Sequence, residues 1–204
     1  MSDSPGDLSG KLFARFKHIP NGFFIEAGAN NGLWQNNTHA FEQIGWKGIL
    51  VEPNRAMFEQ CVKNRPNSLA FHCALVGPEH NSSTINGFFY KEDYENALCG
   101  QVKFEGTCPQ RWGHSQPREV PARMLKDILA ECGVTKIDLL SLDVEGYEIP
   151  ALDGMNLSVY RPRFAVLETA QKQERCDSYM IANGYKVVEQ LTGNDTLYED
   201  ERAI

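Results

Sequence analysis

The stretch from Phe23 to Gly32 constrains the fold of this chain more than any other. Its sequence, FFIEAGANNG, joins a short apolar run that ends at Glu26 to a loop of small residues with glycines at Gly28 and Gly32. A helical pattern follows over 36–44. Strand, tight glycine loop and helix is how an α/β fold brings backbone close to a nucleotide-like ligand. Glycine permits the turn and the close approach because it has no Cβ.

The spacing of these glycines argues against one common class of ligand. Dinucleotide-binding folds carry G-x-G-x-x-G after the first strand, whereas this loop reads E-x-G-x-x-x-G. A nicotinamide-dependent oxidoreductase is therefore an alternative that lacks its diagnostic motif. Taken alone, the stretch is also compatible with an ordinary strand-to-helix turn.

Strands and helices alternate along the rest of the chain. Apolar runs predict strands at 48–52, 68–76, 84–90, near Val120, from 137 to the acids at 143 and 145, and at 163–169. Helical spacing predicts helices at 8–17, 55–64, 124–132, 147–152 and 174–182, and turn residues at 192–195 predict a hairpin between 186–191 and 196–198. This alternation predicts a parallel, doubly wound α/β sheet in a single domain over residues 1–204.

Composition limits the partners. A formal net charge of −7 over 204 residues argues against a broad nucleic-acid or membrane surface. No apolar run approaches the length of a membrane span, and the polar residues 1–10 do not resemble a signal peptide. The six cysteines form no C-x-x-C pair, which argues against zinc and favours a reducing compartment, with a disulfide between Cys99 and Cys108 as the weaker alternative. We therefore expect a cytoplasmic protein with no nucleic-acid or membrane partner. The sequence leaves its oligomeric state open.

Carboxylates end four of the predicted strands: Glu26, Glu52, Asp143 followed by Glu145, and Glu168. Because parallel strands end at one edge of a sheet, these acids should gather where ligands bind in such folds. Glu52 follows the glycine loop by about twenty residues, the position of an acid that accepts ribose hydroxyls; a helix cap is the alternative. Clustered carboxylates attract a cation, whether an amino group, a sulfonium or a divalent metal.

The segment 91–117 predicts a variable substrate loop. It has no sustained hydrophobic period and contains aromatic and basic side chains: Tyr94, Phe104, Arg111, Trp112 and His114. Long irregular insertions in compact domains are usually functional or disordered. A substrate lid and a surface loop with a few buried anchors are both compatible with this composition.

Five segments together resemble the FkbM-type S-adenosylmethionine-dependent methyltransferases: FIEAGANNG, ILVEPN, CALVG, VPARMLKDIL and IDLLSLDVEGYEIPAL. The resemblance extends from about Gly22 to the C-terminus and is made specific by the order and spacing of the motifs. It implies a Rossmann-like class I methyltransferase: a mostly parallel seven-stranded sheet with a C-terminal antiparallel hairpin and helices on both faces. It also implies O-methylation of a hydroxyl group, frequently on a sugar or a natural product.

The resemblance further implies which part of S-adenosyl-L-methionine each residue contacts: Glu26 and Gly28 the methionine part, with Asn30 and Gly32 continuing that loop; Glu52 the ribose hydroxyls; Ala74 and Leu75 the adenine; and Asp143 the side that faces cofactor and acceptor. Two positions depart from the family pattern. The first acid, often Asp, is here Glu26, which has a longer reach. The residue two before Asp143, often Lys, is here Ser141, which removes a cation near the site.

Methylation of a sugar hydroxyl requires a general base within hydrogen-bond reach of the proton that leaves. The candidates are Asp143, Glu145 and His114, with Asp143 preferred. Asp143 and Glu168 could instead hold a divalent metal such as Mg²⁺ or Mn²⁺, which would lower the pKa of the acceptor oxygen. The expected acceptor is a small molecule or a glycan, with a protein acceptor left open. A binding module that keeps the fold without chemistry is a further alternative, against which the intact set of acids argues.

Overall fold

The computed structural model describes residues 8–89, 100–102, 117–170 and 173–202 of the chain. Its helices are α1 (Leu8–Phe16), α2 (His39–Gln43), α3 (Arg55–Asn64), α4 (Leu125–Glu131), α5 (Glu148–Met155) and α6 (Gln173–Ala182). Its strands are β1 (Phe23–Ala27), β2 (Lys47–Val51), β3 (Leu69–Phe71), β4 (Ala74–Leu75), β5 (Thr84–Phe89), β6 (Gly100–Val102), β7 (Pro117–Arg123), β8 (Ile137–Leu142), β9 (Pro162–Glu168), β10 (Tyr185–Gln190) and β11 (Asp195–Asp200).

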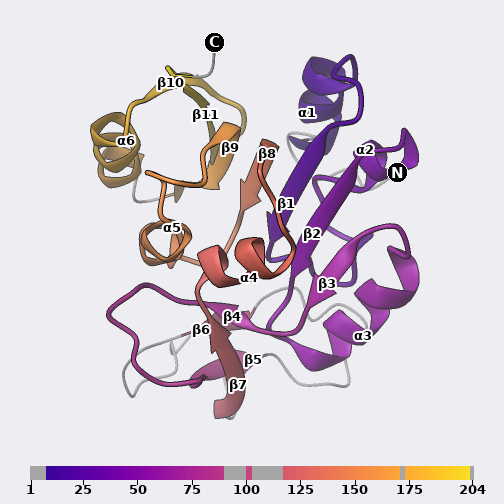
Figure 1. Cartoon of the computed structure of the whole chain (residues 1–204), viewed down its shortest axis with the longest axis vertical. Helices are drawn as coiled ribbons and strands as arrows, with labels where there is room; N and C mark the ends of the chain where they lie inside the picture. The colour runs from indigo at the N-terminus through magenta and orange to yellow at the C-terminus, as the bar shows by residue number, and fades with distance from the viewer. Residues whose placement is uncertain (1–7, 90–99, 103–116, 171–172, 203–204) are drawn as a thin grey trace.

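Seven of the strands form the central sheet, in the order β10-β11-β9-β8-β1-β2-β3 (Figure 1). The pairs from β9 to β3 are all parallel, whereas β11 runs antiparallel to both β9 and β10. The predicted α/β fold, its mostly parallel seven-stranded sheet and its C-terminal antiparallel hairpin are confirmed.

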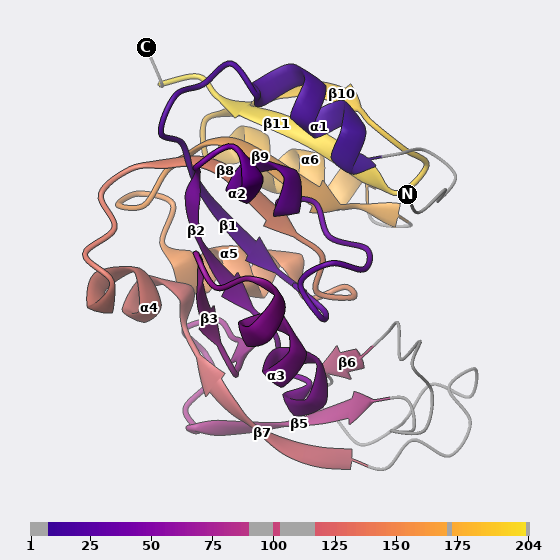
Figure 2. The same cartoon turned by 90° about the vertical axis from the view of Figure 1, so that its right-hand side faces the viewer.

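Helices cover both faces of this sheet (Figures 1 and 2). Successive side chains of a strand point to opposite faces, so neighbours such as Phe24 and Ile25 enter different cores. One core joins the strands to α4, α5 and α6 through Ile128, Leu152 and Met180. The other joins them to α1, α2 and α3 through Leu12, Phe41 and Cys61.

A second, four-stranded sheet, in the order β4-β7-β5-β6, was not predicted. The apolar run at 68–76, expected to form one strand, instead divides. Its first part, β3, pairs with β2, and its second part, β4, pairs with β7. The small sheet has its own apolar cluster, which includes Ile85, Phe89 and Val120. The strand expected at 84–90 and the one near Val120 are confirmed as β5 and β7.

Two further predictions differ in extent. The helix expected over 36–44 is confirmed only as the short α2, because the side-chain oxygen of Asn36 accepts the backbone N–H groups of Thr38 and His39 ahead of the first turn. Of the expected loop at 91–117, the structure describes β6 and the first residue of β7. Tyr94, Phe104, Arg111, Trp112 and His114, and also Cys99 and Cys108, lie outside the described residues.

Two observations concern the cellular setting. Within the described ranges, no helix combines the length and the apolar character that crossing a bilayer would require. The cysteines at 61, 73, 132 and 176 form no disulfide.

A buried arginine on the C-terminal side of α3 fixes the chain that follows β1. Arg65 has no solvent-exposed surface. Its guanidinium donates to Glu42 Oε2 at 2.6 Å, to the carbonyl oxygen of Gly32 at 3.1 Å, to Asn36 Oδ1 at 2.9 Å and to Thr38 Oγ1 at 3.1 Å. The carboxylate of Glu26 lies 3.9 Å from Nη1. One cation therefore holds two buried carboxylates and three positions of the loop.

Replacing this arginine should be strongly destabilising. Arg65→Met would leave Glu26 and Glu42 as uncompensated buried charges, a change that typically costs about 3–5 kcal/mol. Arg55→Met is the matched control, because Arg55 forms an exposed pair with Glu59 on the same helix and such pairs contribute about 0–1 kcal/mol. Urea unfolding of both variants measures the free energies, and equal losses would contradict the assignment.

Candidate active site

A cleft opens at the carboxyl ends of β1, β2 and β8. It encloses about 800 Å³, including the part open to solvent. Its walls are formed by Ala27, Gly28, Asn30, Gln35, Val51, Glu52, Pro53, Asn54, Met57, Cys73, Ala74, Leu75, Asp143, Val144, Glu145 and Tyr147. The structure therefore gathers Gly28, Asn30, Glu52, Ala74, Leu75, Asp143 and Glu145, all predicted site residues, around one space.

Gly28 allows the loop to cross the end of β8. Its φ is +86°, and a Cβ placed there would lie 2.0 Å from the carbonyl oxygen of Asp143. The N–H groups of Gly28 and Ala29 both donate to the carbonyl oxygen of Val51, at 3.0 and 3.1 Å, and the N–H of Asp143 donates to Ala27 at 3.1 Å. These bonds join the ends of three neighbouring strands, so a side chain at position 28 cannot be accommodated without moving one of them.

Glu52 is held in the cleft wall by backbone donors on both sides. Its side chain accepts the N–H of Asn30 at 2.8 Å and the N–H of Asn54 at 2.7 Å. Only 8% of the residue is exposed. Burial raises the pKa of Glu52 to about 7, although both hydrogen bonds favour the ionised form. The carboxylate is thus oriented, little hydrated and in need of donors from a ligand, which suits two ribose hydroxyls.

Asp143 and Glu168 form a carboxyl pair at the ends of β8 and β9. The Asp143 side chain faces the cleft, where it is accessible but surrounded by protein, and it is hydrogen-bonded to Glu168. Removal from bulk water, then the charges of Glu168 and Glu145, raise the pKa of Asp143. Burial also raises the pKa of Glu168, to about 6. The two carboxyls are therefore coupled: the charge of one opposes ionisation of the other, so the pair takes up a proton at higher pH than an isolated carboxyl would.

Two further acids surround this pair and were not predicted. Asp195 is the register partner of Glu168 across β11 and β9, and Glu148 begins α5 and accepts the N–H of Gly146 at 2.8 Å. Both add negative charge that raises the pKa of Asp143. The predicted site residue Glu145 lies in the same turn with a φ of +56°. Such backbone conformations are sparsely populated and concentrate at functional sites.

Two predicted cofactor residues, Glu26 and Gly32, do not line the cleft. Glu26 pairs in register with Leu50 and Ser141, one row before the strand ends. Its carboxylate accepts from the side chains of Asn36 and Thr38 and from the N–H of Asn37, and burial raises its pKa.

Gly32 packs against α3 instead. A Cβ on it would lie 2.6 Å from Cγ of Arg65. Glu26 and Gly32 therefore support the loop after β1 from the side away from the cleft.

The side chains of Gln35, Met57, Cys73 and Tyr147 complete the cleft and were not predicted. No pattern in the sequence indicates them, because the helix or loop that carries each is brought to the cleft only by tertiary packing. Tyr147 also donates from its hydroxyl to Glu79 at 3.3 Å, which links the turn after β8 to the small sheet.

The predicted metal site has only its two carboxylates. Among the described residues, no three His, Cys, Asp or Glu side chains come together in a group that could hold a metal ion. Asp143 and Glu168 are hydrogen-bonded to each other, and a metal is not supported among the described residues. The third candidate base, His114, lies outside the described ranges.

The charge of the lining favours a cationic ligand. Three acidic residues, Glu52, Asp143 and Glu145, line the cleft, and its described lining contains no Lys, Arg or His. A pyrophosphate would meet repulsion here, whereas a sulfonium and an amino group would be attracted. The residues present therefore fit S-adenosylmethionine better than a nicotinamide dinucleotide.

Solved methyltransferases share this fold. The chain is similar to a ribosomal protein L11 methylase from Lactobacillus delbrueckii subsp. bulgaricus, with a TM-score of 0.53 and 8% identity over 95% of this chain and 78% of that one. It is also similar to a putative caffeoyl-CoA O-methyltransferase from Staphylococcus aureus, with a TM-score of 0.54 and 7% identity over 95% of this chain and 81% of that one. The METTL16 methyltransferase domain is similar as well, with a TM-score of 0.53 and 13% identity over 94% of this chain and 65% of that one. At these identities the likeness establishes the fold, that of Rossmann-like class I methyltransferases.

Sequence comparison places the chain within that class. A sequence model of the methyltransferase FkbM domain matches residues 26–187, which is most of the chain. The protein therefore belongs to the FkbM methyltransferase family, and this membership implies S-adenosylmethionine as the cofactor. No curated protein matches the sequence significantly.

The crossing at Gly28 can be tested against a glycine of similar conformation. Gly45 has a φ of +95° with nothing within 4 Å of its potential Cβ, so Gly45→Ala should cost only the left-handed backbone strain, about 1–2 kcal/mol. Gly28→Ala adds a clash with Asp143 and should also weaken S-adenosylhomocysteine binding by about tenfold or more, which is at least ~1.4 kcal/mol. Calorimetric titration measures the binding and thermal unfolding measures the stability. If Gly28→Ala and Gly45→Ala had the same effects, the close approach of Gly28 to Asp143 would be refuted.

The buried Glu52 should give a distinctive pH dependence. Its pKa rises from 4.5 to about 7 on folding, so between these values the folded state holds a proton that the unfolded state has lost. The free energy of unfolding should therefore fall as pH rises through this window, by up to about 1.4 kcal/mol per pH unit from this group. Glu52→Gln should remove that part of the slope, whereas Glu59→Gln, on the exposed side of α3, should not. Urea unfolding at pH 5 and 7.5 distinguishes them, and a slope that survives in Glu52→Gln would show that other groups cause it.

Proposed function

We propose that this protein is an O-methyltransferase that transfers the methyl group of S-adenosylmethionine to a hydroxyl of a sugar or glycan. The observation that carries the proposal is the carboxyl pair of Asp143 and Glu168 at the ends of β8 and β9, of which Asp143 lines a cleft suited to a cationic cofactor. Transfer to oxygen needs a group that removes the hydroxyl proton, and this pair supplies one at the edge of the sheet where the cofactor is expected.

The residues of the cleft define how the cofactor would be held. Glu52 would accept the ribose hydroxyls, the backbone around Gly28 and Asn30 would lie along the methionine part, and Ala74 and Leu75 would contact the adenine. Glu26 would act through the loop that it fixes. When bound, S-adenosylmethionine supplies a methyl group already activated by its sulfonium. The protein therefore contributes chiefly alignment of the acceptor oxygen and removal of its proton.

Asp143 is the residue that would receive this proton. Asp143 is hydrogen-bonded to Glu168, and the proposed resting state holds one proton between the two carboxyls. As the hydroxyl proton moves to the cleft-facing oxygen of Asp143, the shared proton can move fully to Glu168. Both carboxyls are then protonated and neutral, and no buried charge is created. Glu145 lies in the same turn and is the alternative acceptor.

Several features support a small or glycan acceptor rather than a nucleic acid. The net charge is −7, and the described cleft lining carries only acidic charge, which would repel a phosphate backbone. O-methylation of sugar hydroxyls is also what the FkbM resemblance implies. The four described cysteines form no disulfide, which supports a reducing, cytoplasmic setting.

The proposal is tested with the whole chain. Calorimetry should show binding of S-adenosylhomocysteine and none of NAD. Incubation with S-adenosylmethionine and a panel of methyl hexopyranosides should then yield S-adenosylhomocysteine and a methylated sugar, detected by mass spectrometry. Binding of NAD instead, or cofactor binding without methylation of any sugar, would overturn the proposed reaction.

Asp143→Asn should separate chemistry from binding. It should lower kcat by about 10²–10⁴-fold, the usual contribution of a general base, while changing the Kd of S-adenosylhomocysteine little. Asp127→Asn, an exposed acid in the first turn of α4, is the control and should leave both unchanged. Turnover of the parent protein should decline as pH falls below about 6, because the pair then becomes fully protonated. Full turnover in Asp143→Asn would assign the base elsewhere.

A further inference from the structure

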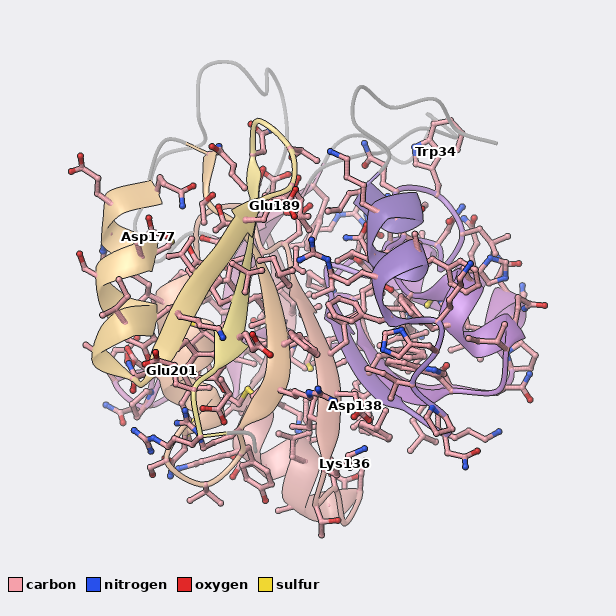
Figure 3. All side chains as sticks on the ribbon, turned by 90° about the horizontal axis from the view of Figure 1, so that it is seen from above. Trp34, Lys136, Asp138, Asp177, Glu189 and Glu201 are labelled. Carbon is pink, nitrogen blue, oxygen red and sulfur yellow. The ribbon has the colours of Figure 1, made fainter. Side chains whose placement is uncertain are left out.

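The loop that follows β1 exposes two large hydrophobic side chains at its tip. Leu33 is 48% exposed and Trp34 is 46% exposed. Among the described residues, Trp34 is the only Phe, Tyr or Trp in the exposed class. Figure 3 places Trp34 at the opposite end of the molecule from Lys136 and Asp138, which lie at the start of β8. The ring therefore stands on the carboxyl side of the sheet, where the cleft opens.

This tip is held firmly although its side chains are in solvent. The side-chain oxygen of Asn31 accepts the N–H groups of Leu33 at 3.0 Å and Trp34 at 2.8 Å. From α3, Asn64 donates to the carbonyl oxygen of Asn31 at 2.9 Å. Arg65 reaches the next carbonyl in the chain (Gly32). An exposed aromatic ring on a fixed backbone has already lost part of the freedom that binding would otherwise cost.

The tip is continuous with the wall of the cleft. Gln35, the next residue, lines the cleft and has a φ of +47°. Consecutive Cα atoms are about 3.8 Å apart, so the backbone of Trp34 lies at the rim. Asp143 lines the same cleft. A molecule in contact with both would have one face on the ring and one edge at the proposed base.

We propose that Trp34, with Leu33 beside it, is the platform on which the pyranose ring of the acceptor stacks. This inference rests on the proposed O-methyltransferase function and names residues that select its substrate. A pyranose has one face of C–H groups, which packs on an aromatic ring, and hydroxyls at its edge, which remain free. Stacking on Trp34 would leave one of these hydroxyls directed into the cleft toward Asp143.

A second copy of this chain is the competing occupant, since exposed hydrophobic groups also mark protein interfaces. One observation favours the sugar: the tip adjoins the cleft through Gln35, so an occupant of the tip can also reach the cleft. The test below includes the oligomeric state so that this occupant is detected.

The experiment uses the whole chain saturated with S-adenosylhomocysteine and methyl hexopyranosides as probes. Saturation-transfer NMR should show the ring C–H protons of at least one probe in contact with the protein. Trp34→Ala should weaken that binding by about tenfold or more, and Trp34→Phe by less. The control is Val159→Ala, which truncates the most exposed of the large hydrophobic side chains described, at 65%. It should leave binding unchanged.

The outcomes distinguish the proposed Trp34 platform from the proposed O-methyltransferase function on which it rests. If Trp34→Ala retains S-adenosylhomocysteine affinity, as measured by calorimetry, and loses the probe, the platform is supported. If probe binding is unchanged, or if no pyranoside binds the cofactor-loaded protein, the platform is overturned while the cofactor site stands. If S-adenosylhomocysteine itself does not bind, the proposed function fails and the platform with it. A dimer in light scattering that Trp34→Ala converts to monomers would assign the tip to self-association and overturn the platform.

Discussion

The ion pairs of Arg65 are the constraint on which the cleft depends. A loop rich in glycine and asparagine has little side-chain volume with which to fix itself, and its conformation must be imposed from outside. Arg65 does this from beneath, because a guanidinium has five donors in a rigid plane and here reaches Glu42, Asn36, Thr38 and Gly32 together. Its charge also balances Glu26. The acid of the first strand is therefore paired within the protein, and other acidic residues line the cleft.

Local patterns were sufficient to predict most of the sheet and the gathering of its acids. Strand ends show in the sequence as apolar runs closed by Glu52, Asp143 and Glu168, and parallel pairing brings such ends to one edge. Register is what these patterns do not contain. Glu26 lies one row too early to face the cleft, and Asp195 reaches Glu168 only through the antiparallel return of β11. The hydrogen-bond partners of Arg65, at sequence separations of 23 to 33 residues, leave no periodic signal.

The acidic lining is costly to the folded protein and useful to the site. The pKa of Glu52 is raised by burial, and those of Asp143 and its neighbour Glu168 by loss of hydration and by the surrounding acids, which means that their ionised forms are held at a disadvantage. A cation in the cleft would relieve this disadvantage, so part of the binding energy would come from strain already present without ligand. Local rules of folding are expected to fail at sites of this kind.

The division of one apolar run between two sheets has a consequence for how this scaffold can diversify. Because β4 pairs with β7 and not with β3, the wall that contains Ala74 and Leu75 belongs to the small sheet, whose strands also delimit the long insertion between β5 and β7. Sequence drift in the small sheet can reshape this wall of the cleft while the seven-stranded sheet and its carboxyl pair stay in place. New acceptors could thus be acquired by altering a peripheral module, with the methyl-donor half inherited intact.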